Sequence, residues 1–460
     1  MSPWIARHVV YPLQELACRR PTFPYLAELE RSQWLSRAEL EELQRLKLNR
    51  LLAVALEHSP WHAARITEAS LAGAVREATC SLPDLARLPL MDKQEARTHR
   101  DEIAWQGVPG GAFKYNTGGS SGEPLVFYFG RERQASDAAG RMRARRWWGV
   151  APGEREAYLW GAPVELAKTD RIKTLRDRLI NQLVLNAFAM SPSRMDDYLE
   201  ALAAWRPVCL YGYASSVALL AAHAEARGKS LRLPQLRVVC TTGEPLYPHQ
   251  RELIERVFGV PAANEFGSRD IGFTAHEAPG GVLLLLSESH VLEVVDAQGN
   301  PCAPGVPGEA VITGLTSAAQ PFIRYRTGDV VTLSTRSDPG GRGLHVLESV
   351  TGRQTDFVVA ADGTIMHALA VIYVLRAIDG VARFKCIQHS PRQMQVLVVP
   401  GARWTDASAA DITRGLRARL GEEVDVTLEL VDDIAPEASG KHRYVVSHAK
   451  LADQLNQAQS

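Results

Sequence analysis

A loop rich in glycine and hydroxyl side chains occupies residues 117–124. Its glycines allow the backbone to fold closely around a ligand, so that successive N–H groups can donate hydrogen bonds to phosphate oxygens. The hydroxyl groups of Thr117, Ser120 and Ser121 are further donors. The same composition also suits a hairpin loop that binds nothing. No lysine follows the last glycine and the chain has no Gly-x-Gly-x-x-Gly, so the sequence supports neither a Walker loop nor a dinucleotide fingerprint.

An aromatic residue and an acid share a second segment, Asn264-Glu-Phe-Gly-Ser-Arg-Asp-Ile-Gly272. The ring of Phe266 can stack on a base, and the carboxylate of Asp270 can bind a divalent metal ion. Taken alone, Phe266 is better explained as an aromatic residue of the core.

Two further segments place a charged side chain directly after a glycine. Asp329 directly follows a glycine, and a carboxylate that accepts two hydrogen bonds is the usual way to hold the hydroxyls of a ribose. Lys441 lies in a glycine-containing loop, Ala438-Ser-Gly-Lys-His-Arg443. In isolation, a helix cap and a surface lysine are the better explanations of these two residues.

The first hundred residues, which precede these groups, are predicted to be helical and to cover the core. Ser36 and Glu39 form a capping-box pattern at the start of one helix, and Pro60 ends it. One face of that helix is apolar and contains Leu40, Leu43, Leu51 and Val54.

Strand–loop–helix units follow, from about residue 113 to about residue 333. Residues 207–216 and 236–258 are two of them, and the helix of the second is predicted over residues 248–258. Such repeats favour a mainly parallel, layered α/β domain that binds ligands beyond the carboxyl ends of its strands. Residues 291–295 and 310–313 are predicted to be two strands joined by a turn.

The composition excludes several classes of function. Lys and Arg together number 52, as do Asp and Glu, so zero net charge gives no general electrostatic case for binding nucleic acid. No apolar run approaches the roughly 18 residues of a membrane helix. The start lacks a basic region followed by an apolar core, so we expect no secretory signal. The six dispersed cysteines are expected to be buried thiols of a cytoplasmic protein.

An arginine-rich run and a pair of histidines are explained by the fold rather than by a ligand. The arginine-rich run at residues 141–146 is predicted to lie on a solvated helix face, with contact to coenzyme A phosphates as the alternative. His276 and His290 have no cysteine beside them, so we predict hydrogen-bonded or surface histidines there and no zinc site.

Together and in this order, the segments resemble those of the adenylate-forming (acyl-CoA synthetase) superfamily. Within it, the chain resembles the phenylacetate–coenzyme A ligase branch, including ligase-like proteins of capsular polysaccharide biosynthesis. The likeness spans roughly residues 10–450 and rests on Thr117-Gly-Gly-Ser-Ser-Gly-Glu-Pro124, Thr242-Gly-Glu-Pro245, Phe266-Gly-Ser-Arg-Asp270, Tyr325-Arg-Thr-Gly-Asp329, Gly352-Arg353 and Ser439-Gly-Lys441. It implies an α/β fold with a large layered N-terminal domain, residues 1–352, and a small mobile α+β domain, residues 353–460, that carries Lys441.

The resemblance also implies a role for each motif. The ATP phosphates would contact Thr117, Gly118, Gly119, Ser120, Ser121 and Gly122. The adenine and ribose would lie against Gly243, Glu244, Pro245, Glu265, Phe266, Gly267, Asp329 and Arg353. Asp270 would bind magnesium, and Lys441 would approach the carboxylate and α-phosphate. The acyl group would lie near Tyr211, Gly212, Tyr213 and Ala214.

The implied reaction has two steps and uses ATP, Mg²⁺ and coenzyme A. A small carboxylic acid attacks the α-phosphate of ATP, which gives an acyl-adenylate and pyrophosphate, and the thiol of coenzyme A then displaces AMP. No residue pattern identifies the acid or the final acceptor, so acyl transfer to an amine or a hydroxyl is an alternative. Relatives in this branch are often dimers, so a homodimer is a possible assembly.

Three positions depart from the family's pattern. Glu123 stands where the phosphate loop often has lysine, Asp270 is shorter than the common glutamate, and Thr355 replaces a hinge acid. Glu123 and Thr355 support a third possibility, a catalytically silent nucleotide-binding protein. The presence of both Asp329 and Lys441 counts against it.

Overall fold

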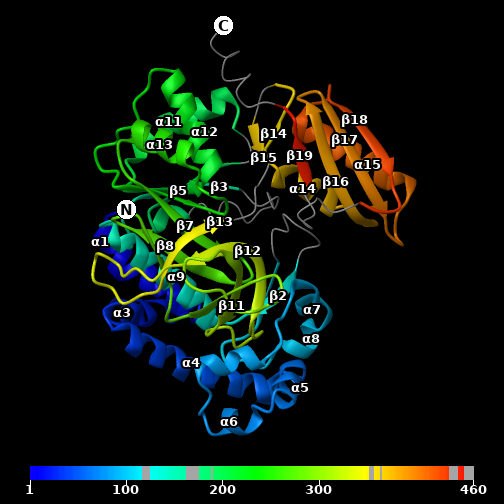
Figure 1. Ribbon diagram of the computed structural model, residues 1–460. Coiled ribbons are helices and arrows are strands. Elements are labelled where there is room, and N and C mark those ends of the chain that lie inside the picture. The colour runs from blue at the N-terminus through cyan, green and yellow to red at the C-terminus, as the bar shows by residue number, and fades with distance from the viewer. Residues whose placement is uncertain are drawn as a thin grey trace. The chain divides into compact units, whose positions relative to one another are not determined.

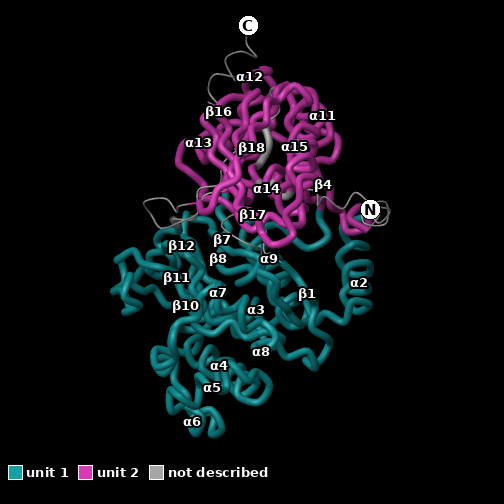
Figure 2. The backbone as a smooth tube through the Cα atoms, turned by 90° about the vertical axis from the view of Figure 1, so that its right-hand side faces the viewer, with its two compact units in different colours: residues 1–117, 125–154, 263–353 teal, residues 118–124, 155–262, 354–460 magenta. Residues whose placement is uncertain are grey.

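The computed structural model (Figure 1) describes residues 1–116, 125–161, 176–187, 190–351, 357–362, 365–434 and 444–449. The chain divides into two compact units, coloured separately in Figure 2. Residues 1–117, 125–154 and 263–353 form the first unit, and residues 118–124, 155–262 and 354–460 form the second. The predicted boundary between residues 352 and 353 stays a prediction.

Helices form most of the first hundred residues. The longest, α4 (Arg37–His58), begins at the predicted capping box: Ser36 Oγ accepts a hydrogen bond from the Glu39 N–H at 3.3 Å, and the Glu39 carboxylate accepts one from the Ser36 N–H at 2.8 Å. None of the described helices is both long and apolar enough to cross a membrane. The other short elements of this segment are α1 (Pro3–Ile5), η1 (Ala6–Val10), α2 (Tyr11–Ala17), α3 (Thr22–Ser32), α5 (Pro60–Glu68), α6 (Ala72–Arg76), η2 (Leu82–Arg87), α7 (Lys93–Thr98) and α8 (Arg100–Ile103).

A hairpin and a long helix follow in the first unit. Strands β1 (Phe113–Asn116) and β2 (Val126–Phe129) pair antiparallel on either side of the predicted phosphate loop. Helix α9 (Arg131–Trp147) then packs on α3 and on β8.

The sheet of the first unit is antiparallel. Its neighbouring strands follow the order β10, β11, β12, β13, β9, β8 and β7. Their bounds are β7 (Ala262–Ser268), β8 (Gly272–Ala278), β9 (Val282–Leu285), β10 (His290–Val295), β11 (Gly308–Gly314), β12 (Tyr325–Leu333) and β13 (Val346–Thr351). The predicted pair of strands near residues 291–295 and 310–313 is confirmed as β10 and β11.

The prediction of a mainly parallel sheet up to residue 333 is therefore wrong for this part of the chain. Strands β7 and β8 are separated by three residues, as are β8 and β9. Such short connections only allow antiparallel pairing, because parallel neighbours need a crossover of a dozen residues or more.

The second unit contains the parallel strands. Strands β6, β5, β3 and β4 are neighbours in this order, and each pair is parallel, as the strand–loop–helix pattern predicts. The elements are β3 (Glu156–Trp160), β4 (Gln182–Asn186), α11 (Pro192–Trp205), β5 (Cys209–Tyr213), α12 (Ala214–Ala226), β6 (Val238–Thr242) and α13 (Pro248–Phe258). The predicted helix over residues 248–258 is confirmed as α13.

The C-terminal segment of this unit is α+β, as expected. Strands β18, β17, β16 and β19 form one sheet, and β14 pairs with β15. The elements are β14 (Phe357–Val359), β15 (Ile365–His367), α14 (Leu369–Arg376), β16 (Val381–Ser390), β17 (Gln393–Pro400), α15 (Asp406–Leu420), β18 (Asp425–Leu430) and β19 (Val445–Ser447).

The arginine-rich end of α9 is buried, so the prediction of a solvated helix face is wrong. Arg143 is 1% exposed and forms an ion pair with Glu288, with 2.5 Å between Nη1 and Oε1. Arg143 also donates to the carbonyl of Leu29 at 3.2 Å, and Ser32 Oγ donates to Glu288 at 2.8 Å. Helix α3 covers these side chains, which a sequence pattern within α9 alone does not reveal.

Removal of one partner from this buried pair should destabilise the first unit. We expect Arg143→Met to lower the free energy of unfolding by about 3–5 kcal/mol, because Glu288 is left as an uncompensated buried charge. Urea denaturation measures the change. Arg45→Met is the control, since Arg45 pairs with the exposed Glu42, and it should leave the free energy of unfolding nearly unchanged. Equal effects of the two substitutions would contradict the assignment.

Candidate active site

The carboxylate of Asp270 lies in the turn between β7 and β8, half-buried. Tyr325 Oη donates a hydrogen bond to Asp270 Oδ2 at 2.8 Å, and Ser268 Oγ donates to Oδ1. Burial opposes the charged form, but these hydrogen bonds and the nearby ammonium group of Lys93 outweigh it and lower the pKa of Asp270. The carboxylate is therefore charged at neutral pH, as a ligand for a divalent cation must be.

The hydrogen bond from Tyr325 connects two of the predicted motifs. Tyr325 begins β12, and Asp329 lies four residues later on the same strand, half-buried. Gly328 has a φ of +75°, a backbone conformation that favours glycine. The Asp329 N–H donates to Thr327 Oγ1 at 3.1 Å, and the Thr327 hydroxyl donates to the carbonyl of Ala310 at 3.1 Å. These bonds fix the backbone that carries the predicted ribose-binding carboxylate.

Phe266 lies on β7, just before the turn, and is 8% exposed. It belongs to the same hydrophobic core cluster as Tyr325 and Phe127. Phe266 is thus an aromatic residue of the core, as one of its two explanations from the sequence predicts. Its stacking on a base stays a prediction.

The two neighbours of Phe266 are held by close packing. Glu265 is buried and accepts a hydrogen bond from Arg141 Nε at 3.2 Å. A Cβ atom on Gly267 would lie 2.4 Å from the carbonyl oxygen of Gly272. Only glycine fits at this point, where the register of β7 and β8 shifts.

The hairpin that flanks the predicted phosphate loop contacts the same turn. Asn116 and Val126, at the loop ends of β1 and β2, are register partners. Arg269 Nη1 donates to the carbonyl of Asn116 at 3.4 Å, and the Arg269 guanidinium lies 5.7 Å from the ring centre of Tyr115. The residue before the predicted loop is therefore in contact with the neighbour of Asp270.

Other predicted site residues lie outside the described part of the chain. They are Thr117, Gly118, Gly119, Ser120, Ser121, Gly122, Arg353 and Lys441, together with the departures at Glu123 and Thr355. Their roles stay predictions.

In the second unit, the predicted adenine and acyl segments lie at the carboxyl ends of neighbouring parallel strands. Tyr213 ends β5 and pairs with Thr242, which ends β6. Gly243 has a φ of +77° and packs against the ring of Tyr213. The Glu244 carboxylate accepts hydrogen bonds from the N–H of Ser215, at 3.1 Å, and from its hydroxyl. The loop that contains Glu244 and Pro245 is thus tied to the first turn of α12, beside Ala214.

An aromatic stack that sequence reasoning missed borders these segments. The ring of Trp160 lies parallel to that of Tyr213, with 4.4 Å between centres, and 5.6 Å from that of Tyr211. A Cβ on Gly212 would lie 2.7 Å from the carbonyl oxygen of Leu159, so glycine permits this close strand pairing. The available signal for Trp160 was its position at the carboxyl end of a parallel strand.

Both histidines singled out in the sequence are buried and hydrogen-bonded. His290 Nε2 donates to the carbonyl of Ile271 at 2.9 Å, and His276 Nδ1 donates to that of Glu277 at 2.8 Å. Burial lowers the pKa of both side chains, so both are neutral at physiological pH. Within the described ranges, no three His, Cys, Asp or Glu residues are grouped to hold a metal ion.

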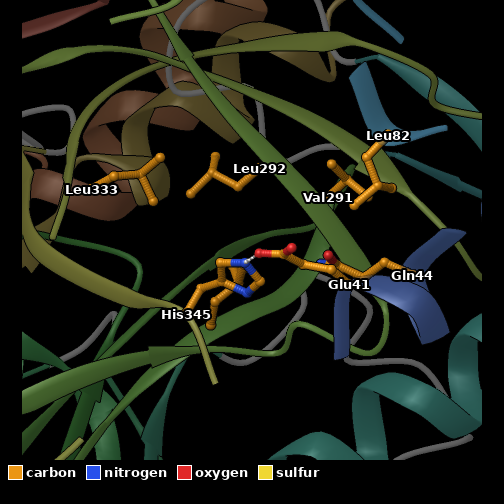
Figure 3. Close-up of a pocket in the computed structure, with 8 residues that line it drawn as sticks. Glu41, Gln44, Leu82, Val291, Leu292, Leu333 and His345 are labelled. Carbon is orange, nitrogen blue, oxygen red and sulfur yellow. Dashed lines mark ion pairs between the residues drawn. The ribbon is translucent and has the colours of Figure 1, made fainter. Parts of the chain in front are cut away.

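A separate cavity of about 140 Å³ lies in the first unit (Figure 3) and contains none of the predicted site residues. His345 faces Glu41 there, with 3.8 Å between Nε2 and Oε1, and Leu292 and Leu333 line another side. Burial and the charge of Arg37 lower the pKa of His345 to about 4. At neutral pH this contact is therefore between a neutral imidazole and a carboxylate.

A solved structure with the same fold is that of 2-hydroxyisobutyryl-CoA ligase in complex with 2-HIB-AMP and CoA. It has a TM-score of 0.62 and 21% sequence identity, and the match covers 93% of this chain and 94% of that chain. A second structure of that ligase, in the postadenylation state, has a TM-score of 0.57. The predicted fold, an adenylate-forming α/β domain with a smaller α+β domain, is confirmed.

Sequence relatives point to the same group. Protein CapK of Staphylococcus aureus is 22% identical over 439 residues, which cover 94% of each chain. Phenylacetate-coenzyme A ligase of Thermus thermophilus is 26% identical over 377 residues, 78% of this chain and 79% of the relative. Residues 358–448 match the CapK C-terminal domain family. The predicted resemblance to adenylate-forming proteins of this branch is confirmed. The chain is similar to the AMP-forming acid–CoA ligases of the phenylacetate–CoA ligase branch.

The lowered pKa of Asp270 makes a testable contribution to stability. Because the folded pKa lies below that of the unfolded chain, the charged form stabilises the fold at neutral pH, and this stabilisation is lost as the pH falls through the folded pKa. We expect Tyr325→Phe to cost about 1 kcal/mol at neutral pH, a modest value because the carboxylate is partly solvated. The difference from the unsubstituted protein, measured by denaturant titration, should shrink below about pH 4. A difference that does not depend on pH would contradict the role of this hydrogen bond.

Proposed function

We propose that this protein activates a carboxylic acid with ATP and transfers the resulting acyl group to coenzyme A. The observation that carries the proposal is the hydrogen bond between Tyr325 and Asp270, which connects the segment of the proposed magnesium ligand to that of the proposed ribose ligand. The contact between Arg269 and Asn116 supports it, because Asn116 precedes the proposed phosphate loop. The names of the relatives support coenzyme A as acceptor.

Asp270 fits a magnesium ion by its chemistry. Its carboxylate is charged and partly exposed, and hard oxygen ligands are those that Mg²⁺ prefers. A magnesium ion bound there would offset the negative charge that accumulates when a carboxylate approaches a triphosphate.

The other residues have distinct proposed tasks in adenylation. Asp329 accepts hydrogen bonds from the ribose hydroxyls, and Gly243 to Pro245 lie against the adenine. Lys441 stabilises the negative charge that develops at the α-phosphate when the acid attacks and pyrophosphate leaves. The acid's carboxylate oxygen then bonds to phosphorus, and the coenzyme A thiol later displaces AMP at the acyl carbon.

The aromatic residues of the second unit bear on the choice of acid. The ring of Trp160 stacks on those of Tyr211 and Tyr213, which belong to the proposed acyl segment. Aromatic side chains favour stacked or edge-on contacts with other rings. We therefore propose an aromatic acid as the substrate.

A pyrophosphate-release screen over aryl, fatty and amino acids tests the function. Aryl acids should give carboxylate-dependent pyrophosphate, with AMP rather than ADP as the nucleotide product, and coenzyme A should accelerate turnover. If turnover depends on an added amine or alcohol instead, the acceptor is that compound and not coenzyme A. Absence of pyrophosphate with every acid would refute the proposal and favour a nucleotide-binding protein without catalysis.

Substitution of the proposed adenylation lysine separates binding from chemistry. Lys441→Ala should reduce carboxylate-dependent pyrophosphate release at least about 100-fold, since one electrostatic donor to a transition state is worth that much, and leave ATP affinity largely unchanged. Lys385→Ala, at a half-buried site on β16, is the matched control and should retain activity. Normal adenylation by the Lys441→Ala variant would show that the lysine is assigned wrongly.

Substitution of the proposed ribose ligand should act on binding. We expect Asp329→Ala to weaken ATP binding about 10- to 100-fold, which corresponds to the loss of hydrogen bonds to a charged group. Isothermal titration with a non-hydrolysable ATP analogue measures this affinity. Asp411→Ala, on α15 in the C-terminal segment, is the control. An unchanged affinity in the Asp329→Ala variant would count against the ribose role.

A further inference from the structure

The turn that carries Asp270 is held by side chains from other elements. Its backbone groups make three such hydrogen bonds: Arg133 Nη2 donates to the carbonyl of Arg269 at 2.7 Å, His290 Nε2 donates to that of Ile271 at 2.9 Å, and Asp137 Oδ1 accepts from the N–H of Phe273 at 3.1 Å. The backbone on both sides of Asp270 is therefore fixed by residues that lie far away in the chain.

Arg133 supplies the positive charge among these three side chains. It is 3% exposed, and its Nε lies 3.7 Å from Asp137 Oδ2. Its guanidinium lies 5.5 Å from the ring centre of Phe127 and 5.7 Å from that of Phe129, both on β2. Among the described residues, its Nη1 has no hydrogen-bond partner. Arg133 thus lies between the hairpin of the proposed phosphate loop and the Asp270 turn, and contacts both.

Two glycines allow helix α9 to approach the turn closely. Gly272 has a φ of +87°, and a Cβ there would lie 2.4 Å from Asp137 Oδ1. A Cβ on Gly140 would lie 2.7 Å from the ring of Phe273. The contact between α9 and the start of β8 therefore leaves no space for the turn to shift toward the helix.

We propose that Arg133 is a positioning residue, which fixes the turn so that the Asp270 carboxylate is held ready for a divalent cation. The role of Asp270 as a cation ligand rests on the proposed function. The claim that Arg133 fixes the turn does not. Arg133 suits this task because its planar guanidinium donates to a carbonyl on one side and packs on aromatic rings on another.

Magnesium dependence tests the proposal in the full-length protein. Arg133→Met keeps much of the side-chain volume but removes the charge and the donors. We expect the Mg²⁺ concentration for half-maximal pyrophosphate release to rise about 10- to 100-fold, as is typical when the support of a metal ligand is lost. The KM for the acid should stay unchanged. Arg133→Lys should restore part of the Mg²⁺ affinity, because lysine returns the positive charge but not the several N–H donors of the guanidinium.

A matched control separates positioning from general destabilisation. Arg65 is also buried, donates to the carbonyl of Leu90 at 3.0 Å and stacks on Trp61. Arg65→Met should lower the melting temperature but leave the Mg²⁺ requirement as in the unsubstituted protein. An unchanged Mg²⁺ requirement in Arg133→Met, or an equal rise in Arg65→Met, would overturn the proposal.

Hydrogen exchange decides the structural part without any activity. Amides of residues 266–273 should exchange at least about tenfold faster in Arg133→Met than in Arg65→Met, since an opening equilibrium shifts by that factor for each 1.4 kcal/mol lost. If no acid yields pyrophosphate with the unsubstituted protein, the proposed function fails while this measurement still decides whether Arg133 holds the turn. If Arg133→Met does not fold, Arg133→Lys and Asp137→Ala take its place, and unchanged exchange in both would refute the inference.

Discussion

The hydrogen bond between Tyr325 and Asp270 is the contact on which the candidate site of the first unit depends. Tyr325 is 1% exposed, so its ring is locked in the core and its hydroxyl is a donor with a fixed position. Asp270 is half-buried at the end of this donor. A flexible pair at the surface would lose most of its interaction energy to solvent and to side-chain entropy. Here the Tyr325 side chain is already immobilised by the core, so the hydrogen bond costs it little conformational entropy. The bond can therefore set the position of the Asp270 carboxylate at the edge of the core.

The fold was predictable wherever a short segment contains its own signal. The start of α4 follows from Ser36 and Glu39, because both capping bonds are made within four residues. Helix α13 follows from Pro248 at its start and Gly259 at its end. The strands β5 and β6 follow in the same way from apolar runs that lead into a loop and a helix. In each case the contacts that decide the structure lie close together in the sequence.

What the sequence could not predict depends on contacts between distant segments. The arginine-rich end of α9 resembles a solvated face until α3 covers it and Glu288 pairs with Arg143. The antiparallel pairing of β7, β8 and β9 depends on short turns that follow a series of strands and helices in alternation. Motif order predicted Asp270 and Asp329 as site residues, but not Arg133 or Trp160, since nothing near these two in sequence differs from an ordinary helix or strand.

The aspartate at position 270 is shorter than the glutamate of the family pattern, and its carboxylate fits the hydrogen-bond donors of the turn. One methylene fewer keeps its carboxylate within reach of the hydroxyl of Ser268, two residues earlier, and of Tyr325. Each carboxylate oxygen accepts one of these side-chain hydrogen bonds and has a second lone pair for another ligand. The shorter acid is therefore compatible with cation binding. The backbone of its turn is held by hydrogen bonds donated by Arg133 and His290 and by one that Asp137 accepts.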